Sequence, residues 1–150
     1  MANTQAVCTS FKVEQLNAIH ALGVTVIRAA ATADAFKAAL FAATATINAA
    51  TTAYAVTGEL SGTGYTAGGV TFAWIAPGST GTTAFTTPTA AFAWTALTSA
   101  AAFDCCLAYN STQANKAVAA YTFGSQNVTA SNFSLTMPTN DATTGLLRTA

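Results

Sequence analysis

Charge is what this sequence has least of. Only 7% of its 150 residues are charged, against about 25% in typical globular chains. Five basic residues balance five acidic ones. The basic residues stand singly, so the chain lacks the cluster of Lys and Arg that binding to nucleic acid or to an anionic membrane surface requires. We therefore expect no nucleic-acid partner and no membrane partner.

Histidine and cysteine are also scarce. The one histidine, His20, falls on the apolar side of a predicted helix, where a partly buried structural role explains it better than a role as general base. The three cysteines, Cys8, Cys105 and Cys106, show no C-x-x-C or Cys/His spacing of the kind that metal sites use. We interpret them as free, reduced, small apolar residues.

The sequence also lacks a catalytic motif. The carboxylates stand singly and no G-x-S-x-G nucleophile context occurs. We therefore name no catalytic, cofactor-binding or metal-binding residue, and we expect the protein not to be an enzyme. A glycan-processing enzyme that uses Glu59 or Asp104 stays open as an alternative, because tertiary folding can bring two distant carboxylates together.

Long apolar runs are missing too. The opening MANTQAVCTSFKVEQL has no cationic start followed by an apolar stretch, so we expect no signal peptide and assembly in a cytoplasm. The most apolar region, residues 29–50, is interrupted by Asp34 and Lys37 and does not resemble a membrane span.

Short β-type runs, separated by turn residues, are what the chain has in quantity. Their regular spacing without long helices predicts a mainly β protein, either an antiparallel β-sandwich or a jelly roll. A helix across residues 29–50 is the alternative in one region, because alanine favours helix. The predicted strands are 24–28, 35–41, 52–60, 69–75, 90–98, 102–110, 116–123 and 132–138, followed by the apolar tail TTGLLRT.

The first residues differ from the rest. Val13, Leu16, Ile19 and His20 share one face of SFKVEQLNAIHA, which predicts a short amphipathic helix over residues 10–21. Gly23 then ends it. We expect residues 1–22 to form an N-terminal arm or short helix, and residues 23–150 to form a single β-sandwich domain.

Aromatic residues must supply most of the buried area, since alanine and threonine dominate the chain. Pairs two residues apart, such as Phe72/Trp74 and Phe92/Trp94, fit one face of a strand. An exposed aromatic stripe that binds carbohydrate would give the same pattern. The expected core aromatics are Phe36, Phe41, Phe72, Trp74, Phe92, Trp94, Phe103, Tyr109, Tyr121, Phe123 and Phe133.

Residues 58–69, GELSGTGYTAGG, hold five of the ten glycines. A phosphate-binding P-loop needs a Lys after its last glycine, and the dinucleotide motif G-x-G-x-x-G needs a following helix. Neither is present, and a predicted strand begins directly at Gly69. The glycines therefore indicate a bend with special backbone geometry, with Tyr65 packed back onto the sheet.

The order of these blocks resembles a family of small structural proteins from the virions of tailed bacteriophages. The block E-x-SGTGYTAGG is its most specific part, and MANTQAVCTSFKVE resembles the start of phage proteins of this length. The other blocks, in order, are DAFKAALF, FAWTALT, FDCCLAYN and YTFGSQNVTASNFSLTMP. The resemblance implies a β-rich, non-enzymatic component of the particle.

A neutral surface rich in threonine favours a subunit packed against neighbours over a free monomer, because little charge repulsion keeps copies apart. We therefore expect a capsid decoration (cement) protein in the virion, whose partners are the major capsid protein and further copies of itself. The alternative is a tail or portal-region adaptor, a fibre base or a receptor-binding tip, and a glycan partner is expected only in that case.

Overall fold

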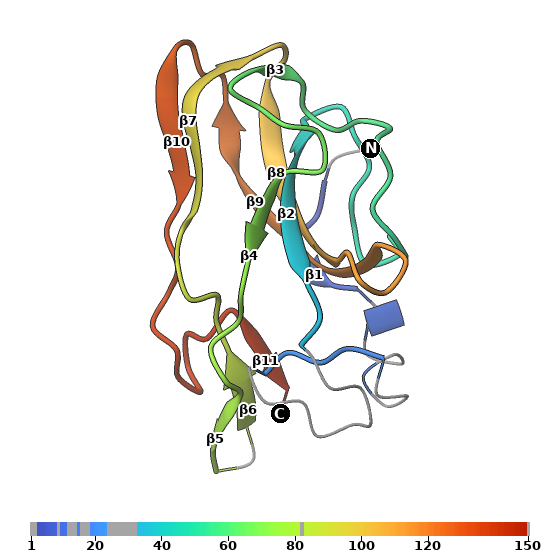
Figure 1. Cartoon of the computed structure of the whole chain (residues 1–150), viewed down its shortest axis with the longest axis vertical. Helices are drawn as coiled ribbons and strands as arrows, with labels where there is room; N and C mark the ends of the chain where they lie inside the picture. Colours follow the sequence, from blue (N-terminus) through green and yellow to red (C-terminus); the bar gives the residue numbers. More distant parts are fainter. Residues whose placement is uncertain are drawn as a thin grey trace.

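The chain folds as an antiparallel β protein in the computed structural model. The structure describes residues 3–8, 10–11, 15, 19–23, 33–81 and 83–149. Their strands form three antiparallel sheets, and two of these pack face to face (Figure 1). The predicted mainly β fold of antiparallel sandwich type is confirmed.

The largest sheet has five strands in the order β1-β9-β8-β2-β4. Its central strand β8 is buried over almost its whole length, because both faces of this sheet are covered. A strand covered on both sides reads as a continuous apolar run rather than an alternating one. The strands are β1 (Ala6–Val7), β9 (Lys116–Gln126), β8 (Phe103–Asn110), β2 (Phe36–Ala42) and β4 (Val70–Phe72).

A second sheet covers one face of the first. Its order is β10 (Ser131–Leu135), β7 (Phe92–Ser99) and β3 (Gly62–Thr63). Strand β7 alternates strictly at its start, with Phe92 and Trp94 buried and Ala93 exposed. The core between the two sheets consists of Ala38, Leu40, Leu60, Phe92, Trp94, Leu97, Phe103 and Cys106.

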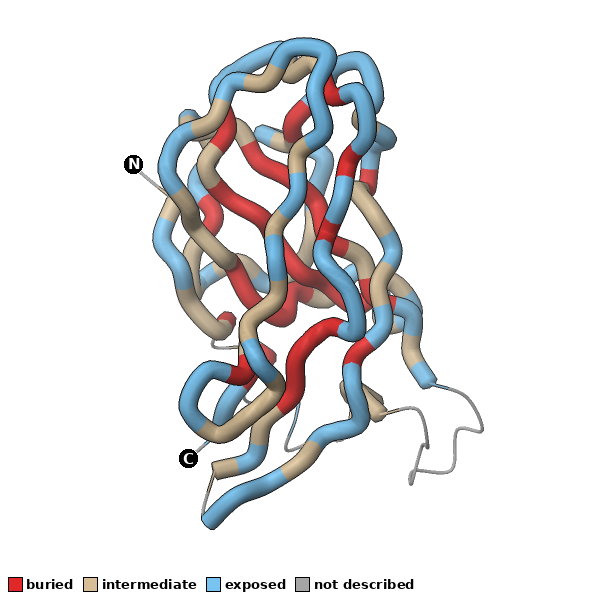
Figure 2. Tube along the Cα trace, turned by 90° about the vertical axis from the view of Figure 1, so that its left-hand side faces the viewer, coloured by how far each residue is buried: buried red, intermediate tan, exposed pale blue. Residues whose placement is uncertain are grey.

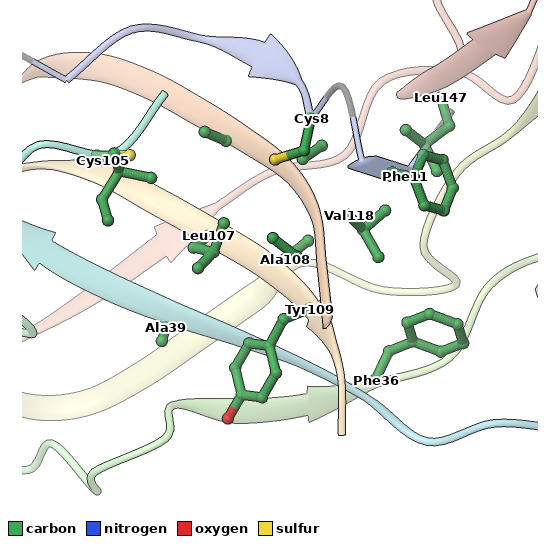
Figure 3. Packing of buried hydrophobic residues seen from close by; sticks show 14 of the residues in the cluster. Cys8, Phe11, Phe36, Ala39, Cys105, Leu107, Ala108, Tyr109, Val118 and Leu147 are labelled. Carbon is green, nitrogen blue, oxygen red and sulfur yellow. The ribbon is translucent and has the colours of Figure 1, made fainter. Parts of the chain in front are cut away.

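Loops and the N-terminal segment cover the other face of the large sheet. Cys8 and Phe11 are buried there against side chains of β8 and β9, including Leu107 and Val118 (Figure 3). Tyr54 stacks on Tyr109 with ring centroids 4.6 Å apart. All three cysteines are buried, and none of them forms a disulfide within the described residues.

The small third sheet has the order β11 (Leu147–Thr149), β6 (Thr83–Thr86) and β5 (Gly78–Thr80). It lies at the end of the sandwich near the C-terminus (Figure 1). Just beyond β4, Ile75 N–H donates to the Thr87 carbonyl at 2.9 Å, and Thr89 N–H donates to the Ala73 carbonyl at 2.9 Å. These bonds join β4 to the chain that leads into β7 and so close one side of the sandwich.

Several strand predictions are confirmed and others are wrong. Strands β2, β7, β8, β9 and β10 lie where the sequence places them. The predicted strand 52–60 is wrong, because this stretch forms turns with isolated bridges at Ala53 and Glu59. The sequence gives no forecast of β1, β3, β5 or β6, three of which lie in glycine- or threonine-rich stretches that resemble turns.

Three predictions fall wholly or partly outside the described residues. The predicted strand 24–28 lies outside them entirely. The predicted helix over residues 10–21 is not seen as a continuous element: Ser10, Phe11 and Gln15 are helical and 19–21 are not, while 12–14 and 16–18 lie outside the described residues. The alternative of a helix across residues 29–50 is wrong for 33–50, where β2 and turns are found.

Candidate functional site

The glycine-rich segment 58–69 covers the part of the β2 edge that β4 does not pair with. Strand β4 pairs with β2 only from Phe36 to Ala38, which would leave the rest of that edge without partners. Leu60 N–H donates to the Leu40 carbonyl at 2.8 Å, and Leu40 N–H donates to the Tyr65 hydroxyl at 3.0 Å. The segment therefore supplies the hydrogen bonds that a longer neighbouring strand would have made.

The Glu59 carboxylate holds this segment together. It accepts hydrogen bonds from the Tyr54 hydroxyl at 2.6 Å, the Tyr65 hydroxyl at 2.7 Å and the Gly68 N–H at 2.6 Å. The Tyr109 hydroxyl donates to the Gly68 carbonyl at 2.8 Å. These bonds describe a structural carboxylate, and Tyr65 packs back onto the sheet as expected.

Backbone contact explains the glycines. Gly69 has φ +74°, and a Cβ added there would lie 1.9 Å from the Ala38 carbonyl oxygen. Gly62, in β3, has φ +142°, and its added Cβ would lie 1.9 Å from the Thr98 carbonyl oxygen. Both positions exclude any side chain, because a carbon and an oxygen cannot approach so closely.

Asp104, the other carboxylate considered for chemistry, and Asp34 are also bonded within the fold. Asp34 Oδ2 accepts from the buried Asn110 side-chain amide at 2.9 Å and from the Ala21 N–H at 3.1 Å. The Asn110 amide nitrogen also lies 3.1 Å from Nδ1 of the half-buried His20. Asp104 Oδ1 accepts from the Asn3 side chain at 2.6 Å. These contacts tie the N-terminal segment to the large sheet.

The tyrosines give a prediction for alkaline pH. Burial raises the pKa of Tyr109 to about 12, with a further contribution from the Glu59 charge. Burial also raises the pKa of Tyr54, Tyr65 and Tyr121. The folded protein therefore binds these protons more tightly than the unfolded chain, whose tyrosines titrate near about pH 10. The resulting stability is fully present below that pH and is lost as the pH rises toward 12.

We expect phenolate absorbance to stay low just above pH 10 and then to rise together with the loss of the circular dichroism signal. The control is the same protein in strong denaturant, where the tyrosines should ionise at about pH 10. Gradual ionisation near that pH in the folded protein, with the circular dichroism unchanged, would contradict the structure.

The outer face of the sheet β10-β7-β3 carries no charge. No charged residue lies between Glu59 and Asp104, or between Lys116 and Asp141, and all three strands come from these two stretches. Among the charged residues that the structure describes, only Arg148 is exposed rather than partly buried, and it belongs to the third sheet. We call the outer face of the sheet β10-β7-β3 the neutral face; its exposed residues are Gly62, Thr63, Ala93, Thr95, Ala96, Ser131, Asn132 and Ser134. Figure 2 shows the exposed parts of the chain in pale blue.

Two hollows lie near the third sheet. The smaller has a volume of about 490 Å³ and borders Gln5, Tyr121 and Arg148. The larger has a volume of about 810 Å³ and a mainly apolar lining that includes Phe11 and Phe85. The buried Tyr121 hydroxyl has no hydrogen-bond partner in the described structure. Neither hollow gathers a recognisable set of reacting groups.

In the part of the chain that the structure describes, no group of three or more His, Cys, Asp or Glu side chains is placed to hold a metal ion. Within the same residues, no helix has the length and apolar character needed to cross a membrane.

The low charge of the chain is evident from its composition, but the residues that surround Glu59 are not. Tyr54 and Tyr65 flank it in sequence, yet their convergence on one carboxylate depends on the turn at 56–58 and on the edge of β2. Comparison with known proteins adds no identity: no protein-family profile, curated protein or solved structure matches this chain.

Proposed function

We propose that this protein is a structural component of a bacteriophage virion, and that it decorates the capsid by binding the major capsid protein. The observation that carries the proposal is the neutral face. The likeness of the sequence blocks to small virion proteins of tailed bacteriophages, with 58–69 the most specific of them, supplies the biological setting.

A neutral face of small residues suits docking onto another protein. Removing an unpaired charged side chain from water costs several kcal/mol, and this face has none to remove. Alanine loses no rotamer entropy on burial, and serine and threonine are short. Contact with a flat capsid surface would therefore cost little, and many copies on one shell would add their contacts.

The polar side chains inside the fold support a structural role. The Glu59 carboxylate has three donors, and Asp34 and Asp104 each bond neighbouring segments. Groups engaged in this way stabilise the fold and leave few free for chemistry. We accordingly propose a non-enzymatic protein without a cofactor.

Co-sedimentation with purified capsids tests the proposal. We expect the wild-type protein to pellet with capsids to the same extent at low and at high salt, because binding through an uncharged face is little affected by ionic screening. Thr95→Glu on the neutral face should abolish pelleting. Ser79→Glu, at an exposed position of β5 in the third sheet, is the matched control and should pellet normally.

Other outcomes would redirect the proposal. Equal pelleting of both variants would show that the neutral face is not the capsid-binding surface. Binding of the protein to purified tails, or to host-surface glycan, with no binding to capsids would favour the tail, portal or receptor-binding alternative.

A further inference from the structure

One side of the sandwich remains open. On the opposite side, the bonds of Ala73 and Ile75 close the gap between the sheets. On the open side, β10 is the edge strand of its sheet and pairs only with β7. Strand β9 is covered by β1 only at Ala119 and Ala120. Within the described residues, no strand pairs with the outer edge of β10.

Apolar side chains lie between these two edges. Phe133 of β10 contacts Phe103 with ring centroids 5.0 Å apart, and Phe123 of β9 with centroids 5.6 Å apart. Unlike Phe103, both Phe123 and Phe133 are only partly buried. We call this set the open seam: Phe123, Val128, Phe133, Leu135 and Met137, all partly buried and packed against the core.

The edge strand β10 has little protection against pairing. Proteins usually guard such an edge with lysine, proline, an inward-pointing charge or a β-bulge. Strand β10 has the sequence SNFSL, with none of the first three. Its bulge is confined to the start of the strand, between Ser131 and Phe133, where the Asn132 side chain accepts a hydrogen bond from Ala96 N–H at 3.1 Å. The stretch from Phe133 to Leu135 is regularly paired with β7.

We propose that β10 pairs with β10 of a second copy of this chain, antiparallel and across a two-fold axis. The two sheets would then continue into each other, and the open seams of both copies would lie together. The inference rests on the proposed function, which places many copies of the protein close together on one shell. It can be refuted independently of that function, because self-association is measured without capsids.

The lack of charge around β10 favours a second copy of this chain as the strand that pairs with its outer edge. A two-fold axis brings a surface against itself, so any charge near the axis would face its own kind. The segment from 117 to 140 has no charged residue, so this penalty is absent. A strongly charged partner strand would instead bury its charges against uncharged side chains without compensation. Antiparallel pairing also continues the only strand arrangement seen in the described sheets.

Sedimentation equilibrium of the purified full chain tests the inference. We expect a concentration-dependent dimer for the wild type and at least about tenfold weaker association for Ser134→Lys, which places like charges near the axis. Ala93→Lys is the matched control, because Ala93 is the exposed Cα partner of Ser134 on β7, one strand in from the edge. It should dimerise like the wild type.

Hydrogen exchange of the wild-type protein provides a second measurement that needs no variant. We expect the amides of β10 to exchange more slowly at high protein concentration, with β5 unchanged. A wild type that stays monomeric at every concentration would overturn the inference. So would equal weakening by both lysine variants, or β10 exchange that is independent of concentration.

Discussion

Gly69→Ala should destabilise the protein by about 3 kcal/mol or more, a large fraction of the free energy of unfolding of a small domain. The added Cβ would lie 1.9 Å from the Ala38 carbonyl oxygen and 2.6 Å from its carbonyl carbon. Residue 69 also has φ +74°, which disfavours any side chain. Ala38 cannot move aside easily, because it pairs with Val70 on one side and Ala108 on the other.

Substitutions at two other glycines are controls that distinguish the steric clash at residue 69 from the general effect of replacing glycine by alanine. Gly124 has open space around the position of an added Cβ and no positive φ, so Gly124→Ala should leave stability unchanged or slightly higher. Gly81 has φ +60° and the same open space, so Gly81→Ala should cost about 1 kcal/mol from backbone strain alone. Chemical denaturation measures all three, and comparable losses for residues 69 and 81 would refute the proposed contact with β2.

Glu59→Ala is expected to cost about 3 kcal/mol. The substitution removes the acceptor for the Tyr54 hydroxyl, the Tyr65 hydroxyl and the Gly68 N–H at once. Tyr65 also accepts the Leu40 N–H, so its displacement would expose the edge of β2. Glu59→Gln keeps the shape and one acceptor oxygen, and it should lose less stability than the alanine variant.

Asp141→Ala is the control for removing a carboxylate that binds backbone. Asp141 Oδ1 accepts from the Thr143 and Thr144 N–H groups at 2.7 Å each, and these bonds hold the pKa of Asp141 below its usual value. That turn is near the C-terminus and exposed to water, so its loss should be much smaller. Equal losses for Asp141→Ala and Glu59→Ala in denaturant titrations would show that Glu59 is not a central anchor.

The strands that sequence analysis predicted well are those whose environment is simple. The side chains of strand β7 alternate between core and solvent, so the spacing of Phe92 and Trp94 predicted a strand there. Strand β8 is buried on both faces, so the apolar run FDCCLAYN predicted it. Periodicity works in both cases because each residue's burial is set by its own strand.

The errors arise where burial depends on other segments. Residues 52–60 contain enough apolar and aromatic side chains to resemble a strand, but Tyr54 is turned to stack on Tyr109 and to bond Glu59. Strand β6 follows a glycine- and threonine-rich turn, and it is stabilised by pairing with the distant β11. Long-range contacts of this kind leave no local periodicity in the sequence.

The candidate surface was predictable only in its composition. The absence of charge from 60 to 103 and from 117 to 140 is visible in the sequence. The register of Ser134 opposite Ala93, which places both stretches on one face, comes from the fold. The open seam likewise requires knowing that β9 and β10 are the edges of different sheets.

Cryo-electron microscopy of the intact phage particle tests the proposed function most directly. The proposal predicts density for this protein at many equivalent positions over the head shell, with the sheet β10-β7-β3 against the major capsid protein. Density confined to a single ring at the portal or tail, or to a fibre tip, would contradict it.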